Sequence, residues 1–247
     1  MNRIALLCAV PQERRPILRR LACPSRGQLE EIPIWSCVSS NLHITLAETG
    51  IGTARAAKAA EEIIRQIAPD IVINTGFCGA VRPGLRRGDI VLAERILAYT
   101  TSLRPATVTL DRTLLDILGS PGKIIFNSGT FITTQYMVAK SRIAPLLDNQ
   151  HPNPVLEMES HAIAEVCCNR GIPFAAVRAV SDTADQDPQP VCGKIFTADM
   201  EISMIKLMKS VITAPQITRK LLRLYLDTES AGKSLAAAVE FSLERLR

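Results

Sequence analysis

Apolar residues recur along the chain with two periods, one typical of strands and one typical of helices. Short runs rich in β-branched residues and bounded by turn residues predict strands. The predicted strands are Ile4–Val10, Ile32–Ser39, Leu42–Glu48, Ile71–Thr75, Asp89–Ala98, Lys123–Asn127 and Phe174–Val180. Apolar residues at helical spacing predict helices, and Gly76–Gly88 is predicted to be a loop. The predicted helices are Glu13–Leu21, the part of Gly50–Ile67 after its glycine turn, Leu110–Leu118, Gln135–Leu147 and Ser160–Asn169.

Strands that alternate with helices are typical of an α/β fold, in which helices cover a mixed or mainly parallel sheet. The C-terminal part, from about Thr197 to Arg247, is also predicted to be helical. Its last stretch carries an apolar stripe at i, i+3, i+4 and i+7 spacing, formed by Leu235, Ala238, Val239, Ser242, Leu243 and Leu246. A helix of this kind packs on its own sheet or mediates assembly, and the sequence leaves both open.

The composition favours one globular domain over residues 1–247, because 47% of the 247 residues are hydrophobic and no linker divides them. The longest apolar runs are too short to span a bilayer, and the N-terminus lacks a secretory pattern. We therefore expect a cytoplasmic protein that does not contact membranes. Cysteines such as Cys8, Cys78 and Cys167 lie within apolar elements, which favours reduced thiols over a disulfide framework.

The net charge of +5 is spread along the chain, and aromatic residues make up only 4% of it. Surfaces that bind nucleic acid concentrate basic residues and exposed aromatics, so we expect no nucleic-acid partner. His161 and Cys168 could share one helix face, but two ligands make a poor metal site. We expect no metal and no cofactor.

The segment Val155–Glu165 places Glu157, Met158 and Glu159 where an apolar run ends and a helix begins. A carboxylate there can accept both hydrogen bonds of a vicinal diol, and a thioether beside it offers an apolar surface to a sugar ring. The combination suits a ribose. Acidic residues are also common in first helical turns for dipole reasons, so a structural role is the alternative.

The segment Phe174–Asp185 predicts a buried parallel strand that ends in polar groups. Ligands of α/β sheets bind outside the carboxyl ends of strands, which is where Ser181 and Asp182 lie. The two residues could instead cap a following helix. Arg178 within the strand needs a partner if it is buried, and Glu157 or Glu13 could be that partner without any substrate.

Together with Ile4–Glu13, Glu48–Ala57 and Val72–Ala80, these two segments resemble the purine nucleoside phosphorylase/nucleosidase superfamily, and most closely the 5′-methylthioadenosine/S-adenosylhomocysteine nucleosidases. The five motifs occur in the family's order and at its approximate spacing. The resemblance implies a three-layer α/β/α sandwich around a twisted mixed sheet, with residues 213–247 as a helical C-terminal extension. It also implies a homodimer.

The implied activity is hydrolysis of the N-glycosidic bond of a 5′-substituted adenosine-type nucleoside, which passes through an oxocarbenium-like state and needs two carboxylates. The resemblance assigns Asp182 as the acid that protonates N7 of the purine and Glu13 as the carboxylate that orients water. The remaining assignments are Arg178 and Glu157 for the water network, Glu159 and Met158 for the ribose, Phe131, Ile132 and Ser181 for the base, and Gly76, Phe77 and Ile51 for the loop near the ribose.

The chain departs from the nucleosidase pattern in places. Phe77 and Cys78 follow the Asn-Thr-Gly stretch where a small residue is usual, and Pro11 and Gln12 precede Glu13 where more glutamates are usual. Residues 99–104 and 184–196, expected near the 5′ side of the nucleoside, match no specificity pattern. The identity of the 5′ substituent is therefore left open.

Two other functions compete with hydrolysis. A nucleoside phosphorylase would hold phosphate with glycine-loop amides and arginines, for which Gly50–Gly52, Arg55, Arg14 and Arg15 are available, but Glu13 would repel the anion. A dinucleotide-binding module would use the same glycines. Its fingerprint needs a third glycine or alanine where Arg55 stands, and an acidic residue about twenty positions on is present only as Asp70.

Overall fold

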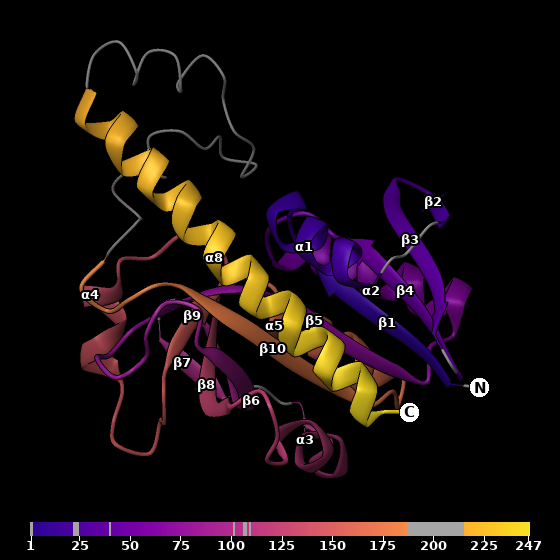
Figure 1. Ribbon diagram of the computed structural model, residues 1–247. Coiled ribbons are helices and arrows are strands. Elements are labelled where there is room, and N and C mark those ends of the chain that lie inside the picture. The colour runs from indigo at the N-terminus through magenta and orange to yellow at the C-terminus, as the bar shows by residue number, and fades with distance from the viewer. Residues whose placement is uncertain are drawn as a thin grey trace.

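A computed structural model describes residues 2–21, 25–39, 41–100, 102–105, 108, 110–186 and 215–247 (Figure 1). Its strands form one ten-stranded mixed sheet. The strands are β1 (Asn2–Cys8), β2 (Ser25–Leu29), β3 (Ile32–Ser39), β4 (Leu42–Glu48), β5 (Ile71–Ala80), β6 (Ile90–Tyr99), β7 (Leu103–Pro105), β8 (Phe126–Thr134), β9 (Val155–Glu157) and β10 (Phe174–Asp182). Their order is β10-β6-β8-β9-β5-β1-β4-β3-β2, and β7 pairs with β6.

The sheet curls back on itself, because β10 pairs with β5 in parallel and with β6 in antiparallel orientation. β1 lies between β4 and β5 and is parallel to both. The carboxyl ends of β1, β4, β5 and β10 therefore point to the same edge of the sheet. This edge is where α/β proteins place their ligands.

Helices cover both faces of the sheet. They are α1 (Pro11–Leu21), α2 (Thr53–Ile67), α3 (Arg112–Gly119), α4 (Lys140–Ile143), α5 (Ser160–Asn169) and α8 (Pro215–Arg245), with a 3₁₀ turn at Ala144–Leu146. Alternate residues of β1 enter different cores. Ile4 and Leu6 pack with residues of α1, α3 and α8, whereas Ala5 and Leu7 pack with residues of α2 and α5. The predicted α/β/α sandwich with a mixed sheet is confirmed.

The long helix α8 lies across the sheet beside α1 and contacts β10 and β5 (Figure 1). The predicted stripe residues Leu235, Ala238, Val239 and Leu243 are all buried in the core that α1 shares. Gly232 lets the helices approach closely, because a Cβ there would lie 2.9 Å from Cγ of Pro16. Of the two possibilities left open, packing on its own sheet is the one observed for this helix. The prediction for residues 197–214 lies outside the described residues.

Three predicted elements differ from the structure. Gly76 and Phe77 belong to β5 and not to a loop, because their backbones pair with Arg178 and Ala179 of β10. The strand expected at Lys123–Asn127 begins only at Phe126, where its partner β6 begins at Ile90. The helix expected at Gln135–Leu147 is reduced to α4, and a separate 3₁₀ turn follows with Pro145 in its first residues, where the missing N–H costs no hydrogen bond.

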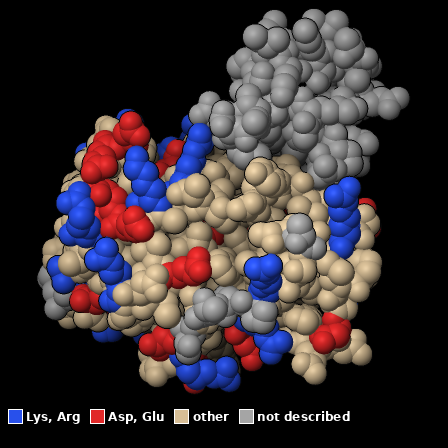
Figure 2. All heavy atoms as spheres, turned by 180° about the vertical axis from the view of Figure 1, so that it is seen from behind, with Lys and Arg blue, Asp and Glu red and all other residues tan. Residues whose placement is uncertain are grey.

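The cysteines agree only in part with the expectation of reduced thiols. Cys8, Cys78 and Cys167 are free and buried, as predicted. Cys37 is disulfide-bonded, so the expectation is wrong there. No helix among the described residues is long and apolar enough to cross a membrane. On the face seen in Figure 2, basic and acidic side chains alternate and form no block of one sign.

Candidate active site

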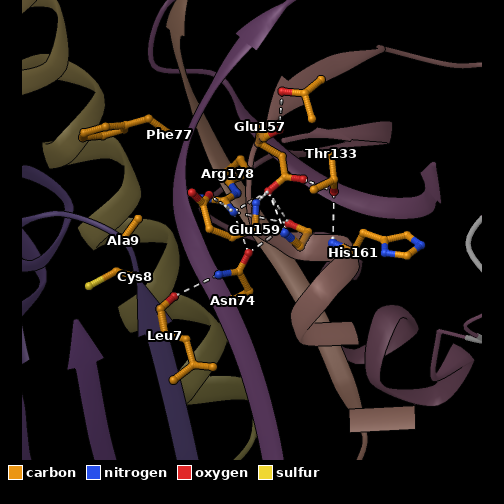
Figure 3. Close-up of polar contacts among 12 residues, drawn as sticks. Leu7, Cys8, Ala9, Asn74, Phe77, Thr133, Glu157, Glu159, His161 and Arg178 are labelled. Carbon is orange, nitrogen blue, oxygen red and sulfur yellow. Dashed lines mark hydrogen bonds and ion pairs between the residues drawn. The ribbon is translucent and has the colours of Figure 1, made fainter. Parts of the chain in front are cut away.

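Arg178 stands in the middle of β10 and its side chain is completely buried. Its Nη2 atom lies 2.6 Å from Oδ1 of Asn74, 2.6 Å from Oε2 of Glu157 and 3.1 Å from Oε2 of Glu159 (Figure 3). Although burial favours the neutral form, the carboxylates of Glu157, Glu159 and Glu13 raise the pKa of Arg178. The guanidinium is therefore a fixed positive charge around which three acids from distant parts of the chain gather.

Glu157 is the last residue of β9, and other groups of the protein form hydrogen bonds with both oxygens of its carboxylate. Its Oε2 accepts hydrogen bonds from the backbone N–H groups of Glu159 at 2.9 Å and Ser160 at 2.8 Å, and the hydroxyl of Thr133 donates to Oε1. Burial alone would raise the pKa of Glu157, but Arg178 and these hydrogen bonds outweigh it and lower the pKa. Glu157 thus anchors Arg178 and the start of α5, which is a structural role.

Glu159 also reaches Arg178 but keeps acceptor capacity. Its Oε1 accepts a hydrogen bond of 3.0 Å from the backbone N–H of Gly52, in the turn before α2. Burial is the main cause that raises the pKa of Glu159 to about 7, and the nearby Glu157 and Glu13 carboxylates add to it against the charge of Arg178. Each carboxylate oxygen has two lone pairs, so Glu159 can accept further hydrogen bonds from a ligand.

Glu13 lies in the first turn of α1 and turns its carboxylate back toward the strands. It accepts hydrogen bonds from the N–H groups of Phe77 at 2.7 Å, Ala9 at 2.8 Å and Val10 at 3.2 Å. Burial raises the pKa of Glu13, although Arg178 and the three donors act in the opposite direction. Its Oε1 atom is 4.0 Å from Nη1 of Arg178. That separation is too long for a direct hydrogen bond.

Gly76 allows the side chains of Arg178 and Glu13 to lie close to each other above β5. A Cβ at position 76 would lie 2.0 Å from Nη1 of Arg178 and 2.5 Å from Oε1 of Glu13. The Asn-Thr-Gly stretch therefore needs glycine in its strand because two charged side chains occupy the space above it. Asn74 in the same strand fixes Arg178 through its Oδ1 atom and donates to the carbonyl of Leu7 at 3.2 Å.

We expect Gly76→Ala to lower the free energy of unfolding by about 3 kcal/mol, the upper end of the usual cost of overpacking. The added methyl group would displace Arg178 or Glu13 from its buried partners. Urea unfolding measures the change as a lower midpoint at unaltered slope. Gly27→Ala is the matched control, since its Cβ would meet Ile34 at an ordinary 3.4 Å. Equal stability of the two variants would mean that Arg178 and Glu13 do not occupy this space.

Asp182 lies at the end of β10 and is paired with a lysine that sequence reasoning did not single out. Nζ of Lys140, in α4, is 2.5 Å from Oδ2 of Asp182 and donates to the carbonyls of Asp182 at 3.3 Å and Thr183 at 2.7 Å. The Ser181 hydroxyl lies 2.7 Å from Oδ1 of Asp182 and 3.2 Å from the carbonyl oxygen of Cys78. The sequence does not show that Lys140 is buried, and its burial beside Asp182 is what marks it as a partner of that residue.

The comparison with known families agrees with this arrangement. Residues 3–214 match the model of the phosphorylase superfamily. The chain belongs to this superfamily.

Several relatives that the chain resembles carry the name of nucleosidases. A 5′-methylthioadenosine/S-adenosylhomocysteine nucleosidase of Buchnera aphidicola is 27% identical over 225 residues, which cover 85% of this chain and 94% of that protein. The fold is similar to that of a Helicobacter pylori enzyme of the same name, with a TM-score of 0.76, 16% identity and 98% of each chain covered. It is also similar to the futalosine hydrolase of Helicobacter pylori, with a TM-score of 0.75, 15% identity and coverage of 98% of this chain and 97% of that one.

Among the described residues, the other predicted site residues of this superfamily member make no side-chain hydrogen bond to Arg178, and they lie in apolar or partly exposed surroundings. Phe131 and Ile132 of β8 are fully buried in apolar clusters, so their contact with a base stays a prediction. The ring of Phe77 points away from Arg178 (Figure 3) and packs with the core that includes α8. The backbone N–H of Phe77 donates a hydrogen bond to Glu13. Met158 and Ile51 are partly exposed beside Glu159 and Gly52 respectively, and their contact with a ribose is likewise a prediction.

Two of the groups that a phosphate would need, the Gly52 N–H and Arg14, are engaged elsewhere in this member of the superfamily. The N–H of Gly52 donates to the Glu159 carboxylate. Arg14 pairs with Glu48 at 2.6 Å and stacks over Trp35, with its guanidinium carbon 4.0 Å from the ring centroid. A dinucleotide-binding module would use Asp70 for a ribose. Asp70 directly precedes β5, at the opposite edge of the sheet, and its carboxylate accepts a hydrogen bond of 2.7 Å from the N–H of Arg3.

Proposed function

We propose that the protein hydrolyses the N-glycosidic bond of an adenosine-type nucleoside that carries a substituent at its 5′ position. The observation that carries this proposal is the presence of two carboxylates in different surroundings at one edge of the sheet. Glu13 is held by three backbone N–H groups near Arg178, and Asp182 is held by Lys140. Inverting glycoside hydrolysis uses such a pair, one to protonate the leaving group and one to activate water. The nucleosidase relatives support the same reaction.

In the proposed reaction Asp182 gives a proton to N7 of the purine while the bond between C1′ and N9 breaks, and the electron pair of that bond stays with the base. A water molecule held between Oε1 of Glu13 and Nη1 of Arg178 adds to C1′ and gives its proton to Glu13. The 4.0 Å between those two atoms, and the lack of another hydrogen-bond partner for Nη1 among the described residues, support this water position.

The ribose is proposed to bind through Glu159, whose carboxylate accepts hydrogen bonds from the 2′ and 3′ hydroxyls, with Met158 against the sugar ring. The turn at Ile51 and the strand residues Gly76 and Phe77 would form the nearby wall, and Phe131, Ile132 and Ser181 would contact the base. Arg178 and Glu157 hold this arrangement through the contacts described above.

Hydrolysis is preferred to phosphorolysis for an electrostatic reason. Three buried carboxylates, those of Glu13, Glu157 and Glu159, surround the buried guanidinium of Arg178. A phosphate that entered this cluster would add negative charge where three carboxylates already face one guanidinium. The experiment that tests the function is to incubate the protein with a panel of 5′-substituted adenosines, with and without phosphate, and to measure free base. Release that requires phosphate would favour the phosphorylase.

We expect Glu159→Gln to weaken nucleoside binding, since hydrogen bonds to a charged acceptor contribute about 1.5–3 kcal/mol. Because the pKa of Glu159 is raised to about 7, its carboxyl is neutral below that pH and charged above it. Nucleoside affinity should therefore rise as the pH rises through about 7, and this rise should be missing in the variant. Calorimetry measures binding without turnover if the ligand is a C-nucleoside analogue, in which a carbon–carbon bond joins C1′ to the base and cannot be hydrolysed.

Adenine serves as the control ligand for this variant, because it lacks the diol. If Glu159→Gln weakens adenine and the nucleoside analogue equally, Glu159 acts on the structure of the site and does not bind the sugar.

We further infer that residues 1–247 form one domain, since both cores pack against the same sheet. The resemblance of the motifs to nucleosidases supports a homodimer that works in the cytoplasm. Light scattering of the purified protein tests the dimer, and fractionation of cells tests the location.

A further inference from the structure

Lys140 forms a buried ion pair with Asp182, and the proposed function gives Lys140 no chemical step of its own. Lys140 is 5% exposed and Asp182 is 7% exposed. Burying two opposite charges is costly and is often no more stable than an apolar replacement, so such a pair is weak evidence for a role in stability alone. The pair lies at the carboxyl end of β10, where the leaving base is expected.

The surrounding residues leave room for this pair and fix its geometry. A Cβ at Gly79 would lie 2.5 Å from Oδ2 of Asp182 and 3.0 Å from Cε of Lys140, so only glycine fits beneath the contact. Oδ1 of Asp182 faces the Ser181 hydroxyl at 2.7 Å, and Oδ2 faces Nζ of Lys140 at 2.5 Å. Although Nζ is close to Oδ2, that oxygen accepts no well-angled hydrogen bond from the described residues. Its lone pairs are therefore free to take a proton from Nζ, which lies 2.5 Å away.

We propose that Lys140 supplies, through Asp182, the proton that the departing purine receives. This inference rests on the proposed function, because it takes Asp182 as the group that contacts N7. Lys140 itself acts through Asp182 and is a positioning and proton-supplying residue. An ionised carboxylate has no proton to give, and the ammonium group of Lys140 lies 2.5 Å from Oδ2 of Asp182.

The proton transfers balance over one turnover. An N–H bond of the Lys140 ammonium breaks as an O–H bond forms on Asp182, and the Asp182 proton passes to N7 as the bond between C1′ and N9 breaks. Water adds to C1′ and its proton goes to Glu13. The step ends with a neutral Lys140 amine, an Asp182 carboxylate and a protonated Glu13. Solvent then returns the Glu13 proton to Lys140, and no net proton is consumed.

The test compares two leaving groups in full-length variants. A 5′-substituted adenosine needs a proton on its base, whereas a para-nitrophenyl riboside loses a stable anion without one. We expect Lys140→Met and Lys140→Arg both to lower kcat for adenine release by roughly 10²-fold, the lower end of what general acid catalysis contributes. KM should change little. Release of nitrophenolate should fall far less, which also shows that the variants are folded.

Arginine separates proton supply from simple positioning, because it keeps the positive charge and cannot be deprotonated in proteins. If Lys140→Arg restores adenine release, Lys140 only positions Asp182 and the proposal is overturned. Equal losses on both substrates, or no loss on either, overturn it as well. Lys123→Met is the matched control, since Lys123 is exposed, and both of its rates should equal those of the unmodified protein.

The same substrates keep this inference apart from the proposed function. If the unmodified protein releases no base from any nucleoside, the proposed function fails. If Asp182→Asn loses adenine release selectively while the Lys140 variants do not, Asp182 is the acid and only the role of Lys140 is wrong.

Discussion

Asp182→Asn lowers the rate of purine release by roughly 10²–10⁴-fold, the range that general acid catalysis contributes. The asparagine side chain keeps the shape of the carboxyl but has no proton to pass to N7, so the base must leave as an anion. The loss should appear in kcat for 5′-substituted adenosines. It is measured by following free adenine at saturating nucleoside.

Asp116→Asn is the matched control for this prediction. Asp116 lies in α3, is exposed, and its Oδ1 atom is 3.9 Å from Nε of Arg112. Its variant should keep normal turnover, because α3 contributes no residue to the candidate site. Near-normal turnover of Asp182→Asn would assign the acid to another residue and would leave the Lys140 ion pair without a catalytic purpose.

Much of the fold could be predicted from local patterns. The ranges Ile32–Ser39, Leu42–Glu48 and Ser160–Asn169 agree with the observed elements residue for residue, because each has clear periodicity and turn residues at both ends. The loop predicted from Gly76 is wrong for a reason that no local pattern contains. Glycine at that position is required by Arg178 and Glu13, which come from segments far away in sequence.

Only those site residues that lie within a recognisable sequence motif could be predicted. The sequence indicated that a buried Arg178 needs an acidic partner, and Glu157 is that partner at 2.6 Å. It could not show that Glu157 is also consumed by the N–H groups at the start of α5, which separates its role from that of Glu159. Lys140 was missed because it lies in a segment predicted to be an ordinary helix. Its importance comes from burial and from a contact with Asp182, 42 residues away.

The backbone around Glu13 determines how a substitution there must be interpreted. Both oxygens of Glu13 accept hydrogen bonds from N–H groups, Oε1 from Phe77 and Oε2 from Ala9 and Val10. A glutamine has only one acceptor oxygen, so Glu13→Gln must place an amino group against at least one N–H donor. Leaving such a buried donor unsatisfied costs about 1–3 kcal/mol. Thermal unfolding of the variant should therefore be compared with its activity.

We expect Glu13→Gln to lower base release by roughly 10²–10⁴-fold, since it removes the carboxylate that takes the proton from water. Adenine binding, measured by calorimetry, should stay close to that of the unmodified protein, which separates lost chemistry from a collapsed site. The unmodified protein should release a free ribose derivative even in excess phosphate. A phosphorylase would instead form a sugar 1-phosphate, and removal of the charge at position 13 would strengthen phosphate binding by relieving like-charge repulsion. Detection of the 1-phosphate as the main product would therefore overturn hydrolysis, while the roles of Asp182 and Glu159 toward base and sugar would be unaffected.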